Sequence, residues 1–506
     1  MDSTKRIIIN TSAQYIKAVI NICLSLYATR LVLQALDIDD YGIFSVVGGV
    51  VAMLGFVTNA LIVTTQRYLS FYHGKGDTCY VRQIFKNSLF LHIVFAVVLS
   101  VILASLCSWL FDSVLNICLQ RLDAAIHVYY ITIAILATTV VTAPFKSIFI
   151  ARENIVFISI VDVCDGVIKF LMAILLLHVT LDRLVFYAYM MLFVQMANLL
   201  AFAFYALCRF DECDIMIRWK DIDREIQKQL IGFLGWTCYG AGAVAGRNQG
   251  TAVVLNHFCG TGINAAYGIA THVYGAIAFI VTSLLNAMNP QIMKAEGSDN
   301  RQHSLTLAMQ QSKFSTAILA IVIIPIIAEI TSILDYWLVD VPPNTGMFCV
   351  FILVSFIIDQ TTLGLNAANQ ATGDIRLYTL ITYTPKLLFL PVIWWMLAGG
   401  CSPMEVMALF AAVELLVAVI RLPYSKWKLG LNIRTYIAKV VVPLLPLIVL
   451  SVAASLACAC FLHFPLRFLL TLFVGGLTGI MATWRFTLTR QERDYAKHLF
   501  HFSRNS

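Results

Sequence analysis

The sequence predicts an all-α polytopic membrane protein with about fourteen transmembrane helices, because apolar runs of about 20 residues recur along the chain. Of the 506 residues, 60% are hydrophobic and only 12% are charged. A soluble domain has too little polar surface at that composition to cover its outside. In a bilayer, backbone N–H and C=O groups must be satisfied within the chain, so these apolar runs are expected to be helices.

The expected span cores follow from the lengths of the apolar runs. They are 8–36, 41–66, 87–110, 124–145, 154–178, 184–207, 229–256, 264–289, 314–336, 346–367, 377–398, 404–420, 437–461 and 465–484. The 13 cysteines form no Cys-x-x-Cys pair and no cluster with histidine, so we expect neither a metal nor a cofactor.

Basic residues predict the orientation, because Lys and Arg near span ends stay on the cytoplasmic side. Segments placed inside carry 27 of the 35 Lys and Arg residues, and the outer loops carry only Arg121, Arg183 and Arg467. Both termini are therefore expected in the cytoplasm.

The chain divides into similar halves. Tyr41-Gly-Ile and Gly74-Lys-Gly-Asp delimit the second span, and Tyr267-Gly-Ile and Gly297-Ser-Asp delimit the eighth. Six spans per half would make the repeats parallel, as in alternating-access carriers. The predicted domains are 1–210, a cytoplasmic linker at 211–228, 229–430, and 431–506 with two extra helices and a tail. A stripe of Ile222, Ile226 and Leu230 at helical spacing is expected on the membrane surface.

Polar residues in the first span recur every three or four positions and share one helix face. They are Asn10, Gln14, Lys17, Asn21 and Ser25. This face either bonds to neighbouring helices or lines a cavity in which Lys17 contacts an anion. Arg30 lies on another face near the outer end, where it either closes the outer mouth or reaches to the interface.

The seventh span combines glycines with a polar triplet. Gly242, Gly246 and Gly250 have the spacing that lets helices approach closely or bend. No strand precedes them, which excludes a dinucleotide loop. Arg247, Asn248 and Gln249 predict a water-filled site, with Arg247 as either a phosphate contact or a member of a buried ion pair.

Acidic and basic residues also occur together in other spans. Asp162, Asp165 and Lys169 share one face of the fifth span, where Asp165 and Lys169 have ion-pair spacing. Asp359, Lys386 and Glu414 lie at similar depth in the tenth to twelfth spans and are expected to form a triad. Each group is either structural or couples transport to a cation or proton.

The sequence contains no nucleophile–base constellation, phosphate loop or carboxylate dyad, and its outer loops are too short for a catalytic domain. Basic residues follow the inner membrane edge and not a nucleic-acid-binding patch. We therefore expect neither an enzyme nor a nucleic-acid-binding protein.

Several motifs resemble those of Wzx-type polysaccharide flippases of the MOP exporter superfamily. They are Thr29-Arg-Leu-Val-Leu-Gln-Ala-Leu, Asp40-Tyr-Gly-Ile-Phe-Ser-Val-Val-Gly-Gly, Gln66-Arg-Tyr-Leu-Ser, Gly74-Lys-Gly-Asp, Gln249-Gly-Thr, Asn256, Asn264-Ala-Ala-Tyr-Gly-Ile-Ala, Asn289-Pro-Gln-Ile-Met-Lys and Ala371-Thr-Gly-Asp. The resemblance implies two V-shaped, MATE-like six-helix lobes in the bacterial inner membrane and alternating access without ATP. The implied substrate is an undecaprenyl-diphosphate-linked oligosaccharide, such as an O-antigen repeat unit, moved to the periplasmic leaflet.

The resemblance also implies cavity-facing cations, which map to Lys17, Arg30 and Arg247. Tyr267 stands where relatives often carry a basic residue. The expected partners are the lipid-linked substrate and membrane lipid, with a polysaccharide polymerase and other assembly proteins as further candidates.

Two alternatives to a flippase are a drug/cation antiporter of the related MATE branch and a membrane enzyme such as a glycan polymerase. A cation exporter would be expected to carry acidic residues in its cavity, whereas the first and seventh spans carry Lys17, Arg30 and Arg247. The short outer loops disfavour the polymerase.

Overall fold

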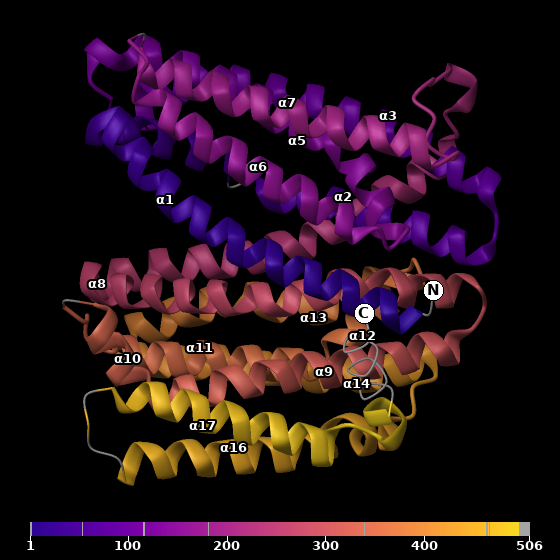
Figure 1. The fold of residues 1–506 in the computed structure, drawn as a ribbon, viewed down its shortest axis with the longest axis vertical. Helices are drawn as coiled ribbons and strands as arrows, with labels where there is room; N and C mark the ends of the chain where they lie inside the picture. Colours follow the sequence, from indigo (N-terminus) through magenta and orange to yellow (C-terminus); the bar gives the residue numbers. More distant parts are fainter. Residues whose placement is uncertain are drawn as a thin grey trace, which may run out of the picture. The chain divides into compact units, whose positions relative to one another are not determined.

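The computed structural model describes residues 3–52, 54–114, 117–180, 182–338, 340–461, 464 and 466–494. Within these residues the chain forms helices and loops without strands, so the predicted all-α class is confirmed (Figure 1). The chain divides into two compact units. Unit 1 comprises Met1–Gly242 and Met293–Asp299, and unit 2 comprises Ala243–Ile292 and Asn300–Ser506.

Unit 1 is built around a long central helix, α5 (Leu122–Ala151), which packs against α1, α2, α3 and α7. The other helices are α1 (Ser3–Ala52), α2 (Gly55–Lys75), α3 (Thr78–Ser105), the short α4 (Cys107–Trp109), α6 (Ile155–Leu176), α7 (Arg183–Arg209) and the start of α8 (Arg224–Gly297). Short segments of other helix types lie at 110–114, 119–121 and 219–221. Ala125, Val128 and Tyr129 of α5 are fully buried in the core of the unit.

The expected boundary between the first two spans agrees with the structure, whereas the expected end of the second span does not. The first span was expected to end at 36, and α1 is divided into two helical parts at Asp37, whose φ of 62° is not helical. The helix α1 ends at Ala52, and α2 begins at Gly55 and runs to Lys75, beyond the predicted end at 66. Because the last turns of α2 contain basic and polar residues, the hydropathy criterion placed the end of the second span too early.

The end of α2 packs very closely against the segment 293–299. A Cβ added at Gly74 would overlap the carbonyl of Lys294, and one added at Gly297 would overlap the carbonyl of Phe71. The two contacts are reciprocal and only glycine permits them. Gly74 and Gly297 are the residues at which the two halves of the sequence show similar stop signals.

The connection from α7 to α8, here called the strap (residues 210–223), is fastened to the start of α3. Lys86 lies 2.8 Å from Asp214 and 2.9 Å from Asp221, and Arg82 donates to the Asp211 carbonyl at 2.6 Å. The stripe expected on the membrane surface is instead directed into unit 1: Ile226 and Leu230 are buried. That prediction was wrong because α8 begins at Arg224 and turns the stripe toward the protein.

Unit 2 contains most of α8 and all later helices. They are α9 (Arg301–Ala328), α10 (Ile330–Trp337), α11 (Thr345–Gln360), α12 (Leu363–Ala371), α13 (Arg376–Ala398), α14 (Pro403–Leu429), the short α15 (Ile433–Tyr436), α16 (Val442–Phe461) and α17 (Arg467–Ala482). Segments with wider helical turns occur at 437–441 and 483–487. The helix α9 packs against α11, α12, α16 and α17, and α16 runs beside α17 (Figure 1).

The helix α8 joins the expected seventh and eighth spans without a loop. Its helical path is broken only at Gly260, where φ is 81°, a conformation that glycine adopts at little cost. Gly250 packs tightly against Leu390 of α13, in agreement with the close helix approach predicted from the glycine spacing.

The expected tenth span is broken at 361–362, where α11 and α12 meet at 44°. A break in a membrane helix frees backbone carbonyls that need other donors. Arg421 of α14 donates to the Asp359 carbonyl at 3.3 Å and to the Thr362 hydroxyl at 3.2 Å. The Tyr436 hydroxyl donates to the Thr361 carbonyl at 2.6 Å. The side chains of α14 and α15 therefore support the break.

The last helices are tied to α9 and α10 by ion pairs. Glu329 accepts from Arg467 and from the Thr471 hydroxyl of α17, and buried Lys313 lies 2.7 Å from Glu492. No partner for Glu329 could be assigned from the sequence, since its partner is 138 residues away. The final residues of the predicted tail, 495–506, lie outside the described residues.

Nine described helices are long and apolar enough to cross a membrane, or ten if α11 and α12 form one bent span. Many large apolar side chains on these helices face outward, such as Val97, Trp395 and Phe473. A soluble protein would bury such residues, so these faces suit lipid. The protein is thus a multi-pass membrane protein, while the count of fourteen spans, the two-lobe arrangement and the domain limits stay predictions.

Candidate functional site

Unit 2 encloses a polar cavity of about 160 Å³ between α8, α11, α13 and α14, here called the unit 2 cavity. Five charged residues line it, together with polar and aromatic side chains. The charged residues are Arg247, Asp359, Lys386, Glu414 and Arg421. Charges are rare and costly within membrane helices unless they are paired or serve a function, which makes this cavity the candidate site.

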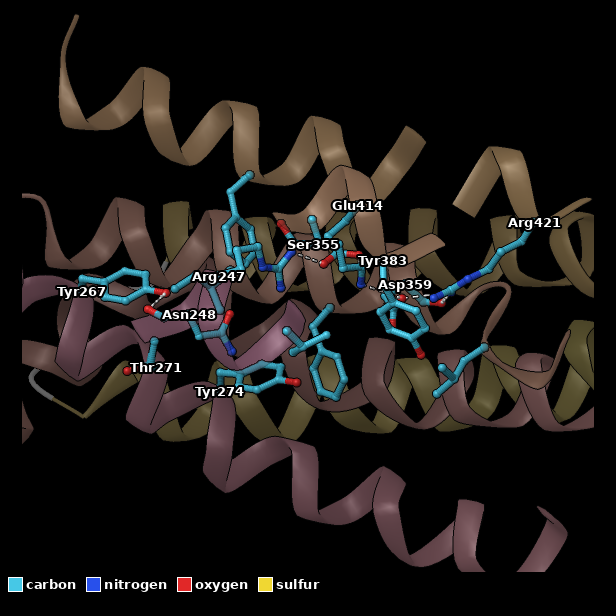
Figure 2. Close-up of a pocket in the computed structure, with 16 residues that line it drawn as sticks. Arg247, Asn248, Tyr267, Thr271, Tyr274, Ser355, Asp359, Tyr383, Glu414 and Arg421 are labelled. Carbon is cyan, nitrogen blue, oxygen red and sulfur yellow. Dashed lines mark hydrogen bonds and ion pairs between the residues drawn. The ribbon is translucent and has the colours of Figure 1, made fainter. Parts of the chain in front are cut away.

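The five charged side chains form a continuous ion-pair network. Glu414 contacts Arg247 at 2.5 Å and Lys386 at 2.8 Å. Lys386 lies 3.7 Å from Asp359, and Asp359 contacts Arg421 at 2.9 Å. Figure 2 shows Arg247, Glu414, Asp359 and Arg421 following one another in a row. Opposite charges alternate along it, so each carboxylate is held between two cations.

The network is buried and has unequal numbers of charges. The side chains of Arg247, Lys386, Glu414 and Arg421 are between 2% and 6% exposed, and that of Asp359 is 19% exposed. Three cations and two carboxylates leave one net positive charge when all are ionised. In a low-dielectric interior such a charge is stabilised by an anion.

Arg247 keeps hydrogen-bonding capacity beyond its ion pair. Its guanidinium lies over the Phe410 ring, 4.0 Å from the ring centre, which orients the plane of the group. Among the described residues, its Nε has no hydrogen-bond partner. A guanidinium fork with an unused donor suits a bidentate oxyanion such as a phosphate.

Neutral donors surround the network. Tyr267, Tyr274 and Tyr383 line the cavity, as do Asn248 and Ser355 (Figure 2). The Tyr267 hydroxyl donates to the backbone carbonyl of Asn248 at 3.2 Å. Asn248 directly follows Arg247 in the chain. Tyr267 thus contributes a hydroxyl beside the network.

The structure brings together several residues that the sequence singled out. Asp359, Lys386 and Glu414 meet, as the expected triad requires, and Arg247 joins them through Glu414. Asn248 lines the cavity, whereas Gln249 does not line it and is exposed. Because residue 249 lies about 200° around the helix from residue 247, the triplet cannot point into one site.

Arg421 was missed as a site residue. The expected twelfth span ended at 420, which placed Arg421 in the cytoplasm, whereas α14 continues to Leu429 and ends at Gly430 in the left-handed conformation. A signal was present in the sequence: Arg421 follows Glu414 by seven residues, so the two share a helix face.

In unit 1, Lys17 is not a free cation. It contacts Asp162 of α6 at 2.8 Å, and Lys146 of α5 approaches the same carboxylate at 3.7 Å. Asn21 donates to the Asp162 carbonyl. The polar face of the first span therefore bonds to α6 over these residues, which is the first of its two predicted interpretations.

The other residues predicted in unit 1 are more dispersed. Asp165 pairs with Lys169 at 2.8 Å and accepts from Asn198 of α7 at 2.6 Å, so the predicted local ion pair is present. Gln14 is buried and Arg30 is exposed. The side chain of Asn10 lies outside the described residues.

No protein-family model matches the chain, and no curated protein matches it. Solved structures do. A MOP superfamily transporter from Pyrococcus furiosus matches with a TM-score of 0.72 at 14% identity over 85% of this chain and 96% of its own. The binding pocket of that transporter is described as having reverse polarity, which suggests a different function for it.

Two further matches are an outward-facing multidrug resistance MATE family transporter of the MOP superfamily and a Vibrio cholerae MATE transporter. Their TM-scores are 0.71 and 0.69 at 14% and 15% identity, over 85% and 86% of this chain and 96% and 97% of theirs. The chain therefore has the fold of MOP superfamily transporters, and the MATE-like architecture implied by the sequence motifs is supported at the level of fold.

Proposed function

We propose that the protein is a flippase that moves an undecaprenyl-diphosphate-linked oligosaccharide from the cytoplasmic to the periplasmic leaflet by alternating access. The observation that carries the proposal is the ion-pair network of the unit 2 cavity, in which three buried cations face two carboxylates. The fold of the chain, that of MOP superfamily transporters, supports a transport role. The bacterial inner membrane, with both termini cytoplasmic, is the proposed location, and a polysaccharide polymerase is a proposed partner.

The chemistry of the substrate explains the value of such a network. A diphosphate crossing the bilayer loses water, and fixed cations can replace part of that hydration. The buried cations must also be stabilised when no substrate is bound, and the two carboxylates stabilise them by ion pairing. When a diphosphate approaches Arg247, Glu414 keeps Lys386 as its partner at 2.8 Å, so Arg247 can be shared with the phosphate without leaving a lone carboxylate.

A MATE-type cation or drug antiporter is the alternative, favoured by the matching multidrug transporter. Such a carrier would be expected to offer a carboxylate to its cationic substrate. In the described part of the unit 2 cavity, both carboxylates are already held by cations: Glu414 by Arg247 and Lys386, and Asp359 by Arg421. The net positive charge of the network would repel a cationic substrate.

The test uses full-length protein in liposomes and a fluorescent prenyl-diphosphate-linked disaccharide whose outer-leaflet fraction is read with a membrane-impermeant quencher. We expect R247Q to reduce the rate of movement at least about tenfold and R247K to retain part of it, because charge without the planar fork gives weaker phosphate contacts. K428Q is the control, since Lys428 forms only an exposed pair with Asp374.

The double variant R247Q/E414Q separates two explanations. It restores the net charge of the network but not the guanidinium, so it should stay as slow as R247Q if Arg247 contacts the phosphate. Movement of the probe by correctly inserted R247Q at the wild-type rate would overturn the proposed role of Arg247.

A further inference from the structure

Unit 1 has its own cavity, here called the unit 1 cavity, with a volume of about 580 Å³. It lies where α1 ends and α2 begins, facing the middle of α5. The described residues that line it carry no ionisable side chain. They are Gly48, Gly55, Phe56, Thr58, Asn59, Ile62, Thr132, Ile135, Leu136 and Thr139.

The polar groups of this cavity are hydroxyls and one amide. Thr132 and Thr139 stand seven residues apart on one face of α5, and each donates to the carbonyl four residues earlier, at 2.7 and 2.8 Å. Their oxygens can therefore still accept hydrogen bonds. Asn59 is exposed, and its side chain has no hydrogen-bond partner in the described part of the chain. Its amide can both donate and accept.

We infer that the unit 1 cavity binds the neutral saccharide portion of the transported molecule. A sugar presents hydroxyls that both donate and accept, and apolar ring faces between them. Asn59 and the threonine oxygens match the hydroxyls, and Phe56 offers an aromatic face of the kind on which a sugar ring stacks. The volume falls in the range of small-molecule sites, about 300–1,000 Å³, and leaves room for a short oligosaccharide.

Other ligands fit these residues less well. A cation would find no carboxylate among the described lining residues, and an inorganic or lipid phosphate would find no Lys or Arg. A lipid tail would leave the Asn59 amide without a hydrogen bond in an apolar environment, which is unfavourable.

This inference deepens the proposed function by assigning a place to the second chemical part of its substrate. A lipid-diphosphate-linked glycan has one anionic group and one neutral, hydroxyl-rich group. The unit 2 cavity is charged, whereas the described lining of the unit 1 cavity is neutral. Each cavity thus fits one of the two groups.

The chain offers two matched pairs of variants. A Cβ added at Gly48 or at Gly49 meets no atom within 4 Å, but only Gly48 lines the cavity, so G48L should fill it and G49L should not. Thr139 lines the cavity and its neighbour Thr138 does not. Both hydroxyls donate to the carbonyl four residues earlier, and Thr138 in addition lies 3.7 Å from the Met196 sulfur. T139V and T138V therefore remove equivalent hydroxyls inside and outside the site. N59A is the fifth variant.

Binding is measured with the purified full-length protein and two probes: farnesyl diphosphate, and farnesyl diphosphate carrying a trisaccharide of N-acetylhexosamines. We expect the wild-type protein to bind the glycosylated probe more tightly. N59A, T139V and G48L should each lower the affinity for the glycosylated probe by roughly three- to tenfold, consistent with the loss of one or two neutral hydrogen bonds. Their affinity for bare farnesyl diphosphate should be unchanged. G49L and T138V should bind both probes like the wild type.

The outcomes separate this inference from the proposed function. Equal affinity for the glycosylated probe in G48L, N59A, T139V and the two controls would overturn the saccharide site alone. Glycan-dependent binding that these three variants weaken, without any binding of bare farnesyl diphosphate, would uphold the saccharide site and count against the diphosphate site. Binding of neither probe by the wild-type protein would refute both.

Discussion

Replacing Glu414 by glutamine removes the carboxylate that Arg247 and Lys386 share. Both cations are buried, with side chains that are 6% exposed, and Glu414 is the only carboxylate within 3 Å of either in the described structure. Removing one partner of a buried ion pair typically costs about 3–5 kcal/mol, because an uncompensated charge remains. We expect E414Q to lose stability in that range, a large share of a typical folding free energy of about 5–15 kcal/mol.

A second change should restore much of the loss. In E414Q/K386M one of the two stranded cations is gone, and Asp359 still pairs with Arg421 at 2.9 Å. The double variant should therefore recover at least about half of the lost stability. D374N is the control, because Asp374 is 61% exposed and its pair with Lys428 contributes little.

The assay is the temperature at which half of the detergent-solubilised protein leaves the monodisperse peak, read together with abundance in the membrane. A stability of E414Q equal to that of the wild type would refute the structural role of the network. If E414Q were also fully abundant and unable to transport, Glu414 would instead be an ion-coupling residue.

Two predictions concern other contacts. R421Q leaves the Asp359 carboxylate with only Lys386, at 3.7 Å, and removes a hydrogen-bond donor from the break between α11 and α12. It should therefore destabilise the protein by about 3–5 kcal/mol in the same assay. An unchanged melting temperature would contradict this. K86A should release the strap and accelerate tryptic cleavage after Arg218, and cleavage at the wild-type rate would show that Lys86 does not fasten it. The hydrogen bond from Lys86 lowers the pKa of Asp214 below its ordinary value. A lowered carboxylate pKa stabilises the folded state above the unfolded pKa of about 3.9. The ion pair between Lys86 and Asp214 should therefore be lost only as the pH falls below that value. The effect of K86A should accordingly be the same at about pH 6 and about pH 8.

Composition and the length of the apolar runs were sufficient to predict the helical class, because a helix of about 20 apolar residues spans the bilayer and satisfies its own backbone hydrogen bonds. Boundaries were harder to predict. Helices α2 and α14 extend about two and a half turns past their apolar cores into segments rich in Tyr, His, Lys and Arg, which hydropathy excludes from a span. The break at Asp37 falls between the expected spans 8–36 and 41–66, whereas the break at 361–362 is supported by tertiary hydrogen bonds such as that from Arg421, which a single sequence does not display.

The candidate site was predictable in part. Asp359, Lys386 and Glu414 could be grouped because their depths in successive spans are similar, and the structure joins them. The pairing of Lys17 with Asp162 was not predictable, since the two residues lie 145 positions apart and either could have faced several helices. The unit 1 cavity gave no sequence signal, because threonine and asparagine also occur in packed helices for structural reasons.

An anionic substrate is the core of the proposed mechanism, and transport of two probes by the wild-type protein distinguishes it from a cationic one. Proteoliposomes would be given the fluorescent prenyl-diphosphate-linked disaccharide or the cationic dye ethidium, the latter with an imposed proton or sodium gradient. We expect the diphosphate-linked probe to change leaflet faster than in protein-free liposomes and ethidium not to be moved. Gradient-driven movement of ethidium, with no movement of the diphosphate-linked probe, would refute the flippase mechanism and identify a cation antiporter.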